Sequence, residues 1–181
     1  MRLGGVRSRV QIPPLRPAIE RMKYSISQQQ RYWAEIPKKS SAIGVLLFGE
    51  SGKVLIVKPH YKDHWTIPGG VIEGNESPIQ AAVREVREEV GLDIQVERLL
   101  CLHYLQHWVG DKKYDSYKFC ALARIEDSGH HKMDGEIEDS KWVTPAEAKK
   151  ILGGSSVNLV KNGLKAIDDG TVVYFESLDK K

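Results

Sequence analysis

The chain lacks long apolar segments. No run of about 18 or more apolar residues occurs in it, so no membrane span is expected. The N-terminus also lacks the apolar central stretch of a secretory signal. These absences favour a cytoplasmic protein without a membrane partner.

Cysteine is scarce, and neither sign of charge prevails. Cys101 and Cys120 lie in apolar, strand-like runs, and their spacing matches no metal or disulfide motif, so we expect buried, reduced thiols. The net charge of +3 is too small to indicate nucleic-acid binding. With 41% hydrophobic and 28% charged residues, the 181-residue chain has the composition and length of one globular domain.

The first residues differ from the rest of the chain. Residues 1–21 are basic, interrupted by prolines and without periodicity, which predicts a disordered or non-native N-terminal extension. We expect the natural start at Met22, and the alternative is a basic tail that contacts nucleic acid. Residues 22–40 follow as a polar lead-in segment to which we assign no helix. The folded domain, with a C-terminal helix and tail, is expected to span residues 41–181.

Strands dominate the middle of the chain, and helices are interspersed among them. Short apolar runs, turn residues and helix caps predict strands at residues 41–48, 54–57, 64–67, 94–107, 114–125 and 141–143, helices at residues 78–90, 145–151 and 156–167, and an edge strand within residues 171–176. This mixture is typical of an α/β sandwich.

One stretch carries far more information than the others. Reading from Gly70, it has the pattern G-x5-E-x7-R-E-U-x-E-E-x-G-U, in which U is a bulky aliphatic residue and the last position is Leu92. From average residue frequencies, such a match is expected on the order of once in 10^9 starting positions. Ser77 and Pro78 begin a helix inside the pattern, and Gly91 ends it.

The arrangement of this helix suggests a cation site. At 100° per residue, Ile79, Val83, Val86 and Val90 form one stripe that we expect to face the core, and Glu85, Glu88 and Glu89 form a separate sector. Neighbouring carboxylates repel one another, and a hard divalent cation converts that repulsion into affinity. For the segment EVREE alone, a solvated charged face is the favoured interpretation. The flanking glycines, Glu76 and Arg84 favour catalysis instead.

The complete pattern resembles the Nudix box, and the resemblance covers roughly residues 41–152. It implies a Nudix-type α/β/α sandwich with a mixed β-sheet, in which the box forms a loop, a helix and a second loop. Nudix hydrolases cleave nucleoside diphosphates linked to another moiety, usually with magnesium. The resemblance therefore implies a pyrophosphohydrolase with Mg²⁺ as cofactor and Mn²⁺ as the alternative.

The resemblance also assigns roles to individual residues. Glu85 and Glu89 match the principal metal ligands, and Glu88 matches a further ligand or a base that orients water. Arg84 matches the residue that orients the carboxylates, through Glu76. Gly70 matches the loop glycine whose backbone approaches the metal or phosphate.

A second acidic segment, DGEIEDSKWV, offers a further ligand or base. The resemblance implies a metal ligand or base in this loop. Its candidates are Glu136 and Glu138, of which Glu136 is preferred. The competing interpretation, a solvated acidic loop, has equal weight. The general base is thus one of Glu88, Glu136 and Glu138.

The expected function is hydrolysis of a pyrophosphate linkage in a small nucleotide, such as a nucleoside triphosphate, by water attack at phosphorus. The alternatives are a nucleotide-sensing, non-catalytic Nudix module and a pyrophosphohydrolase acting on RNA caps or dinucleotide polyphosphates. All box carboxylates are present, which argues against the sensing module. Nucleic acid is not an expected partner, and a homodimer is an open alternative.

Overall fold

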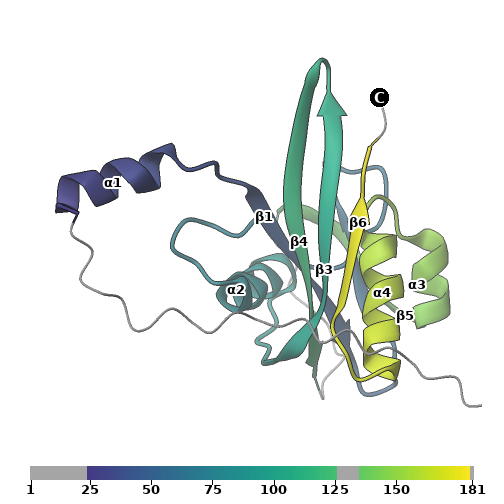
Figure 1. The fold of residues 1–181 in the computed structure, drawn as a ribbon. Helices are drawn as coiled ribbons and strands as arrows, with labels where there is room; N and C mark the ends of the chain where they lie inside the picture. The colour runs from purple at the N-terminus through teal and green to yellow at the C-terminus, as the bar shows by residue number, and fades with distance from the viewer. Residues whose placement is uncertain (1–23, 126–134, 180–181) are drawn as a thin grey trace, which may run out of the picture. The chain divides into compact units, whose positions relative to one another are not determined.

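The computed structural model describes residues 24–125 and 135–179 (Figure 1). The chain divides into two compact units, with the boundary between Lys38 and Lys39. The prediction for residues 1–21 lies outside the described residues.

The first unit contains helix α1, Ile26–Glu35, in the lead-in segment to which the sequence analysis assigned no helix. Its N-terminus is a capping box, because the Ser25 hydroxyl accepts from the Gln28 backbone and the Gln28 side chain accepts from the Ser25 backbone. Arg31 and Glu35 form an ion pair along the helix, 2.7 Å apart. The Ser25–Gln28 capping box is the signal in the sequence that predicts this helix.

The second unit contains a six-stranded mixed sheet. Its strands are β1 Ser40–Phe48, β2 Val54–Pro59, β3 Val96–Val109, β4 Lys112–Arg124, β5 Ile137–Val143 and β6 Val173–Ser177. Their order is β5-β2-β1-β4-β3-β6. The pairs β1–β4 and β3–β6 are parallel, and the other neighbouring pairs are antiparallel.

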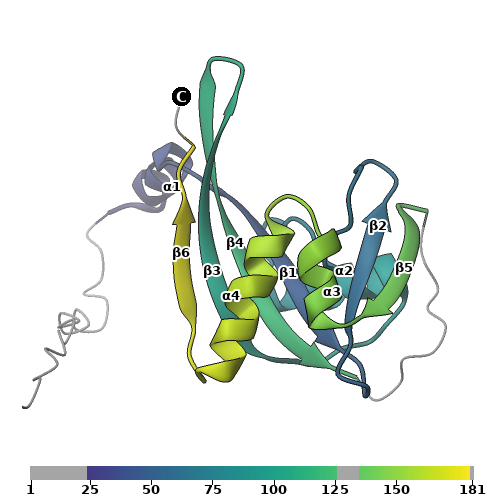
Figure 2. The same cartoon turned by 90° about the vertical axis from the view of Figure 1, so that its right-hand side faces the viewer.

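Helices cover both faces of this sheet, as Figure 2 shows. On one face, α2 (Pro78–Val90) packs on a core cluster that includes Val45, Leu47 and Leu55. On the other face, α3 (Pro145–Ile151) and α4 (Ser156–Asp168) pack on a cluster that includes Leu46 and Ile56. The predicted α/β/α sandwich with a mixed sheet is confirmed.

Helix α2 has the predicted ends. Ser77 caps its N-terminus, and Gly91 follows its last turn in the left-handed conformation, with φ of 69°. The predicted core stripe was wrong at Ile79, which is 58% exposed. The buried face consists of Ala81, Ala82, Val86, Glu89 and Val90. Small alanines let this face approach the sheet, whereas the first turn stays at the surface.

Three strand predictions also need correction. Residues 64–67 form no strand, because only the isolated bridges Thr66–Val57 and Trp65–Leu152 occur there before the chain turns at Pro68. Strand β3 begins and ends two residues later than expected, and β4 begins two residues earlier, so that only Gly110 and Asp111 connect them. Strand β5 begins at residue 137, because its pairing with β2 extends along that whole strand.

The remaining predictions on composition can be compared directly with the structure. Cys101 and Cys120 are neighbours across β3 and β4, and both are buried free thiols as expected. None of the helices in the described ranges is long and apolar enough to cross a membrane. Strand β6 lies at the edge of the sheet, as predicted.

Candidate active site

A glycine loop lies along the start of β1 and faces α2. Three backbone hydrogen bonds hold it there: Val45 N to Pro68 O at 2.8 Å, Ile43 N to Gly70 O at 2.9 Å, and Ile72 N to Ser41 O at 2.9 Å. The loop is therefore fixed to the sheet by its own backbone.

Gly69 connects this loop to the end of the acidic helix. Its N–H donates to Glu89 Oε2 at 2.8 Å, and Glu89 is buried, with 8% of its surface exposed. The φ angle of Gly69 is 136°, and a β-carbon here would lie 2.1 Å from Ile43 O. Glycine is thus the residue that fits this position. The contact fixes one oxygen of the Glu89 carboxylate.

Gly70 lies directly against Glu85. A β-carbon at Gly70 would lie 2.5 Å from Glu85 Oε1, so the absence of a side chain is what makes room for the carboxylate. Burial raises the pKa of Glu85, and the hydrogen bond from Arg84 offsets part of that effect. A bound divalent cation would stabilise the ionised form of this partly buried carboxylate.

Arg84 donates hydrogen bonds to three glutamates of the site, Glu76, Glu85 and Glu88. Its Nε and Nη2 donate to the two oxygens of Glu76 at 2.8 and 2.9 Å, which is the predicted Arg84–Glu76 contact. This pairing lowers the pKa of Glu76 to about 2, so Glu76 is ionised at neutral pH. Nη1 donates to Glu85 Oε1 at 2.8 Å and to Glu88 Oε2 at 3.0 Å, and Nη2 also donates to Val71 O at 3.0 Å. One guanidinium thereby orients carboxylates on two turns of α2.

The donor set of this site fits a hard divalent cation. It offers carboxylate oxygens of Glu85, Glu88 and Glu89, which Mg²⁺ prefers as ligands. The Gly70 carbonyl accepts one hydrogen bond from Ile43 and has a second lone pair. Within the described ranges, however, no three acidic, histidine or cysteine side chains are already arranged as a metal site. Glu88, whose side chain is 54% exposed, has room to move toward an ion.

The second acidic segment approaches the same site at one residue. The pKa of the Tyr61 phenol is raised, first by burial and then by the charges of Glu89, Glu136 and Glu85. Glu136 therefore shares the electrostatic surroundings of the α2 carboxylates. Glu138 instead pairs with Lys58 at 3.4 Å. This electrostatic influence on Tyr61 favours Glu136 over Glu138, and the chemical role of Glu136 stays a prediction.

A cavity of about 340 Å³ borders this site. Gly69 and Gly70 line it, and so do Lys62, Lys118 and Ser155. Lys118 was not predicted as a residue of this cavity. Alternation along β4 could have revealed it, since Lys118 is two residues from the buried Cys120 and thus on the same face.

Fold and site together define an α/β/α sandwich in which a glycine loop lies against an acidic helix. A family model described as "NUDIX domain" matches residues 38–161, and the chain therefore belongs to the NUDIX domain family. The family prediction from the sequence is confirmed, and the match extends the predicted range at both ends.

Two curated relatives illustrate the similarity. The chain is 36% identical to "Diphosphoinositol polyphosphate phosphohydrolase 3-alpha" of Mus musculus over 154 residues, which are 76% of this chain and 92% of the relative. It is 32% identical to "Nudix hydrolase 5" of Arabidopsis thaliana over 111 residues, 58% of this chain and 36% of the relative. Several curated relatives are longer, and this chain spans about half of their length or less.

The solved structures support the fold. The NUDIX domain of Shewanella oneidensis NrtR, solved with ADP ribose, has a TM-score of 0.62 at 19% identity and covers 77% of this chain and 98% of its own. At this identity, the likeness concerns the fold alone.

Proposed function

We propose that this chain is a metal-dependent pyrophosphohydrolase that cleaves a pyrophosphate linkage in a nucleoside diphosphate derivative. One observation carries the proposal: the carboxylates of Glu85 and Glu89 are each fixed against the glycine loop that borders the cavity. Such an arrangement brings metal ligands and a substrate cavity to the same loop. The names of curated relatives, which are hydrolases and phosphohydrolases, support it.

Glu85 and Glu89 would hold the cation, with Glu88 and the Gly70 carbonyl as further ligands. Mg²⁺ is the proposed ion, with Mn²⁺ as the alternative. When bound, a divalent cation polarises the phosphorus and neutralises charge on the phosphate oxygens.

The side chains of this chain have distinct tasks in the reaction. Arg84 keeps Glu85 in place, and Gly69 keeps Glu89 in place. A carboxylate then removes the proton from the water that attacks phosphorus. Glu88 suits this role because it is the most exposed of the three, and Glu136 is the alternative base. The products are a nucleoside monophosphate and the phosphorylated remainder.

The proposal includes a small-molecule substrate and a domain of residues 41–181 that acts in the cytoplasm. The competing function is a sensing module that binds a nucleotide without cleaving it. Retention of Glu85, Glu88 and Glu89 in an ordered network favours hydrolysis, because a sensor has no use for a general base.

The test compares Glu89→Gln with the wild-type protein in a phosphate- and monophosphate-release screen over nucleotides. Glutamine retains the acceptor for Gly69 N–H, so the fold should persist while a charged ligand is lost. We expect kcat to fall at least about 100-fold, the scale on which loss of one charge-stabilising group acts. Glu50→Gln, at an exposed turn outside the site, is the matched control.

Chelation provides the second arm of the same test. Removal of divalent ions should abolish turnover, and added Mg²⁺ should restore it. Turnover that persists in chelator, or a Glu89→Gln variant with near-normal kcat, contradicts the metal mechanism. Nucleotide binding without turnover of any substrate would favour the sensing module.

A further inference from the structure

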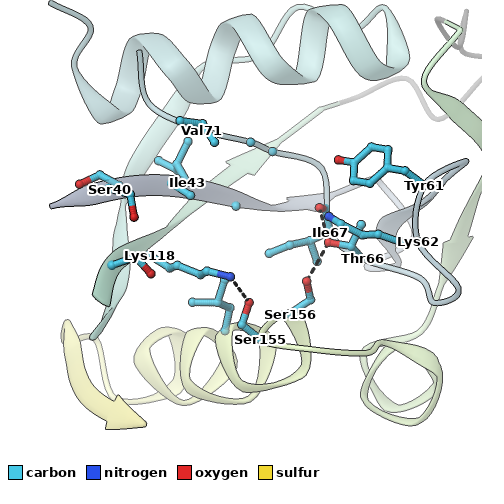
Figure 3. A pocket seen from close by; sticks show the side chains of 17 residues that line it. Ser40, Ile43, Tyr61, Lys62, Thr66, Ile67, Val71, Lys118, Ser155 and Ser156 are labelled. Carbon is cyan, nitrogen blue, oxygen red and sulfur yellow. Dashed lines mark hydrogen bonds between the residues drawn. The ribbon is translucent and has the colours of Figure 1, made fainter. Parts of the chain in front are cut away.

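The cavity beside the glycine loop has an unusual lining. It lies between the start of β1, the strand β4 and the N-terminal end of α4 (Figure 3). Lys62 and Lys118 both line it, together with several hydroxyl groups, and within the described residues no acidic side chain does. A volume of about 340 Å³ is at the lower end of the range for small-ligand pockets. The two lysines and the hydroxyl groups of this lining suit an anionic group.

Lys118 is positioned for binding at this cavity. It lies on β4, opposite Ala42 of β1, and its ammonium group donates to Ser155 Oγ at 2.7 Å. Figure 3 shows the side chain extending toward Ser155 at the beginning of α4. Ser155 makes no side-chain capping bond to its own helix. Its hydroxyl is instead engaged by the lysine, so both groups face the cavity.

The two lysines of the cavity have no ion-pair partner among the described residues. Burial lowers the pKa of Lys118, and the nearby charge of Lys62 lowers it further, so the two ammonium groups repel each other. His103 lies on β3 opposite Lys118, and it adds no charge at neutral pH because burial lowers its pKa to about 4. Among the ion pairs of the described residues, none includes Lys62 or Lys118. Partly buried charges without a counterion cost free energy, and a bound anion removes that cost.

We propose that Lys118 and Lys62 bind a phosphate group of the substrate other than the two joined by the cleaved linkage. This inference rests on the proposed function, because Gly69 and Gly70 belong both to the cavity and to the carboxylate site. The chain should then prefer substrates that carry an additional phosphate. Nucleoside triphosphates, dinucleoside polyphosphates and diphosphoinositol polyphosphates share this chemistry, and nucleoside diphosphate sugars lack it.

Anion binding is tested first without catalysis. Inorganic tripolyphosphate is titrated into the metal-free protein in chelator, and binding is measured by calorimetry. Lys118→Met removes the charge but keeps a long apolar side chain, and we expect at least about ten-fold weaker binding, as for one charge-assisted hydrogen bond. Lys118→Arg should retain binding. Lys161→Met, on the exposed side of α4, is the matched control and should bind like wild type.

Kinetics then separate the substrate classes. The wild-type protein should have a higher kcat/KM for at least one substrate with an additional phosphate than for a nucleoside diphosphate sugar. In Lys118→Met, KM for the former should rise about ten-fold with little change in kcat, and the sugar nucleotide should be unaffected. The three phosphate-rich substrates are assayed separately, so that the one with the largest effect identifies the source of the phosphate.

Two results would overturn the proposal. In the first, tripolyphosphate binds wild type and Lys118→Met equally, or binds neither protein. In the second, Lys118→Met changes KM equally for both substrate classes. Failure of the proposed function gives a different pattern. In that case no substrate is hydrolysed, while tripolyphosphate still distinguishes Lys118→Met from the Lys161→Met control.

Discussion

Gly70→Ala should inactivate the site without unfolding the protein. The new β-carbon would lie 2.5 Å from Glu85 Oε1, 2.6 Å from its carboxyl carbon and 2.7 Å from Oε2. Ordinary contacts are about 3.5 Å or longer, so the Glu85 carboxylate must move by about 1 Å. The moving group is the end of a flexible side chain, so the free energy of unfolding should change by about 1 kcal/mol or less. A displacement of this size in a reacting arrangement can cost about 100-fold in rate.

The assay measures kcat/KM with saturating Mg²⁺ on the best substrate, together with Mg²⁺ affinity and thermal unfolding. Gly74→Ala is the matched control, because a β-carbon there meets nothing within 4 Å. We expect a large loss of kcat and weaker Mg²⁺ binding in Gly70→Ala only. If Gly70→Ala and Gly74→Ala have the same activity and metal affinity, the position of Glu85 does not matter to catalysis and the reasoning fails.

Three other predictions follow from the same contacts. Arg84→Lys should lower kcat/KM about 10- to 100-fold with little loss of thermal stability, because an ammonium group cannot reproduce the paired hydrogen bonds of the planar guanidinium. Full activity of Arg84→Lys would contradict this. Glu136→Gln should lower kcat more than Glu138→Gln, since only Glu136 influences Tyr61 beside the carboxylates, and equal rates in the two variants would refute that assignment. His103 takes up a proton near pH 6.5 in the unfolded chain and near pH 4 when folded, so its contribution to stability is present above pH 6.5 and is lost as the pH falls toward 4. Urea unfolding measures the free energy of unfolding between pH 6.5 and pH 4. The decrease of this free energy should be up to about 3 kcal/mol smaller in His103→Gln than in wild type, and an equal decrease in both proteins would show that His103 is not the cause.

Local rules in the sequence predicted much of the fold. Helix α2 begins at a Ser-Pro pair and ends at Gly91, and these residues determine its limits through backbone hydrogen bonds within a few positions. The strands β1 and β2 are short apolar runs, because each is covered by helices or core on both faces. The family could also be inferred, because the box is a contiguous pattern.

Predictions failed where distant parts of the chain decide the outcome. Ile79 is apolar and has the right helical spacing, yet its side chain is 58% exposed. Residues 64–67 have a strand-like sequence but make only isolated bridges, from Thr66 to Val57 and from Trp65 to Leu152. Burial depends on what the rest of the fold places opposite a residue, and no local pattern contains that information.

The sequence by itself determined which chemical groups the site contains: three glutamates on one helix, an arginine beside them and a glycine loop before them. The tertiary structure decided how they are held. Gly69 meets Glu89 across 20 positions of sequence, and Lys118 meets Ser155 across 37. Contacts of this separation arise only when the loop lies along β1 and α4 packs on the sheet, so the cavity and its uncompensated lysines emerge from packing between elements rather than from any one segment.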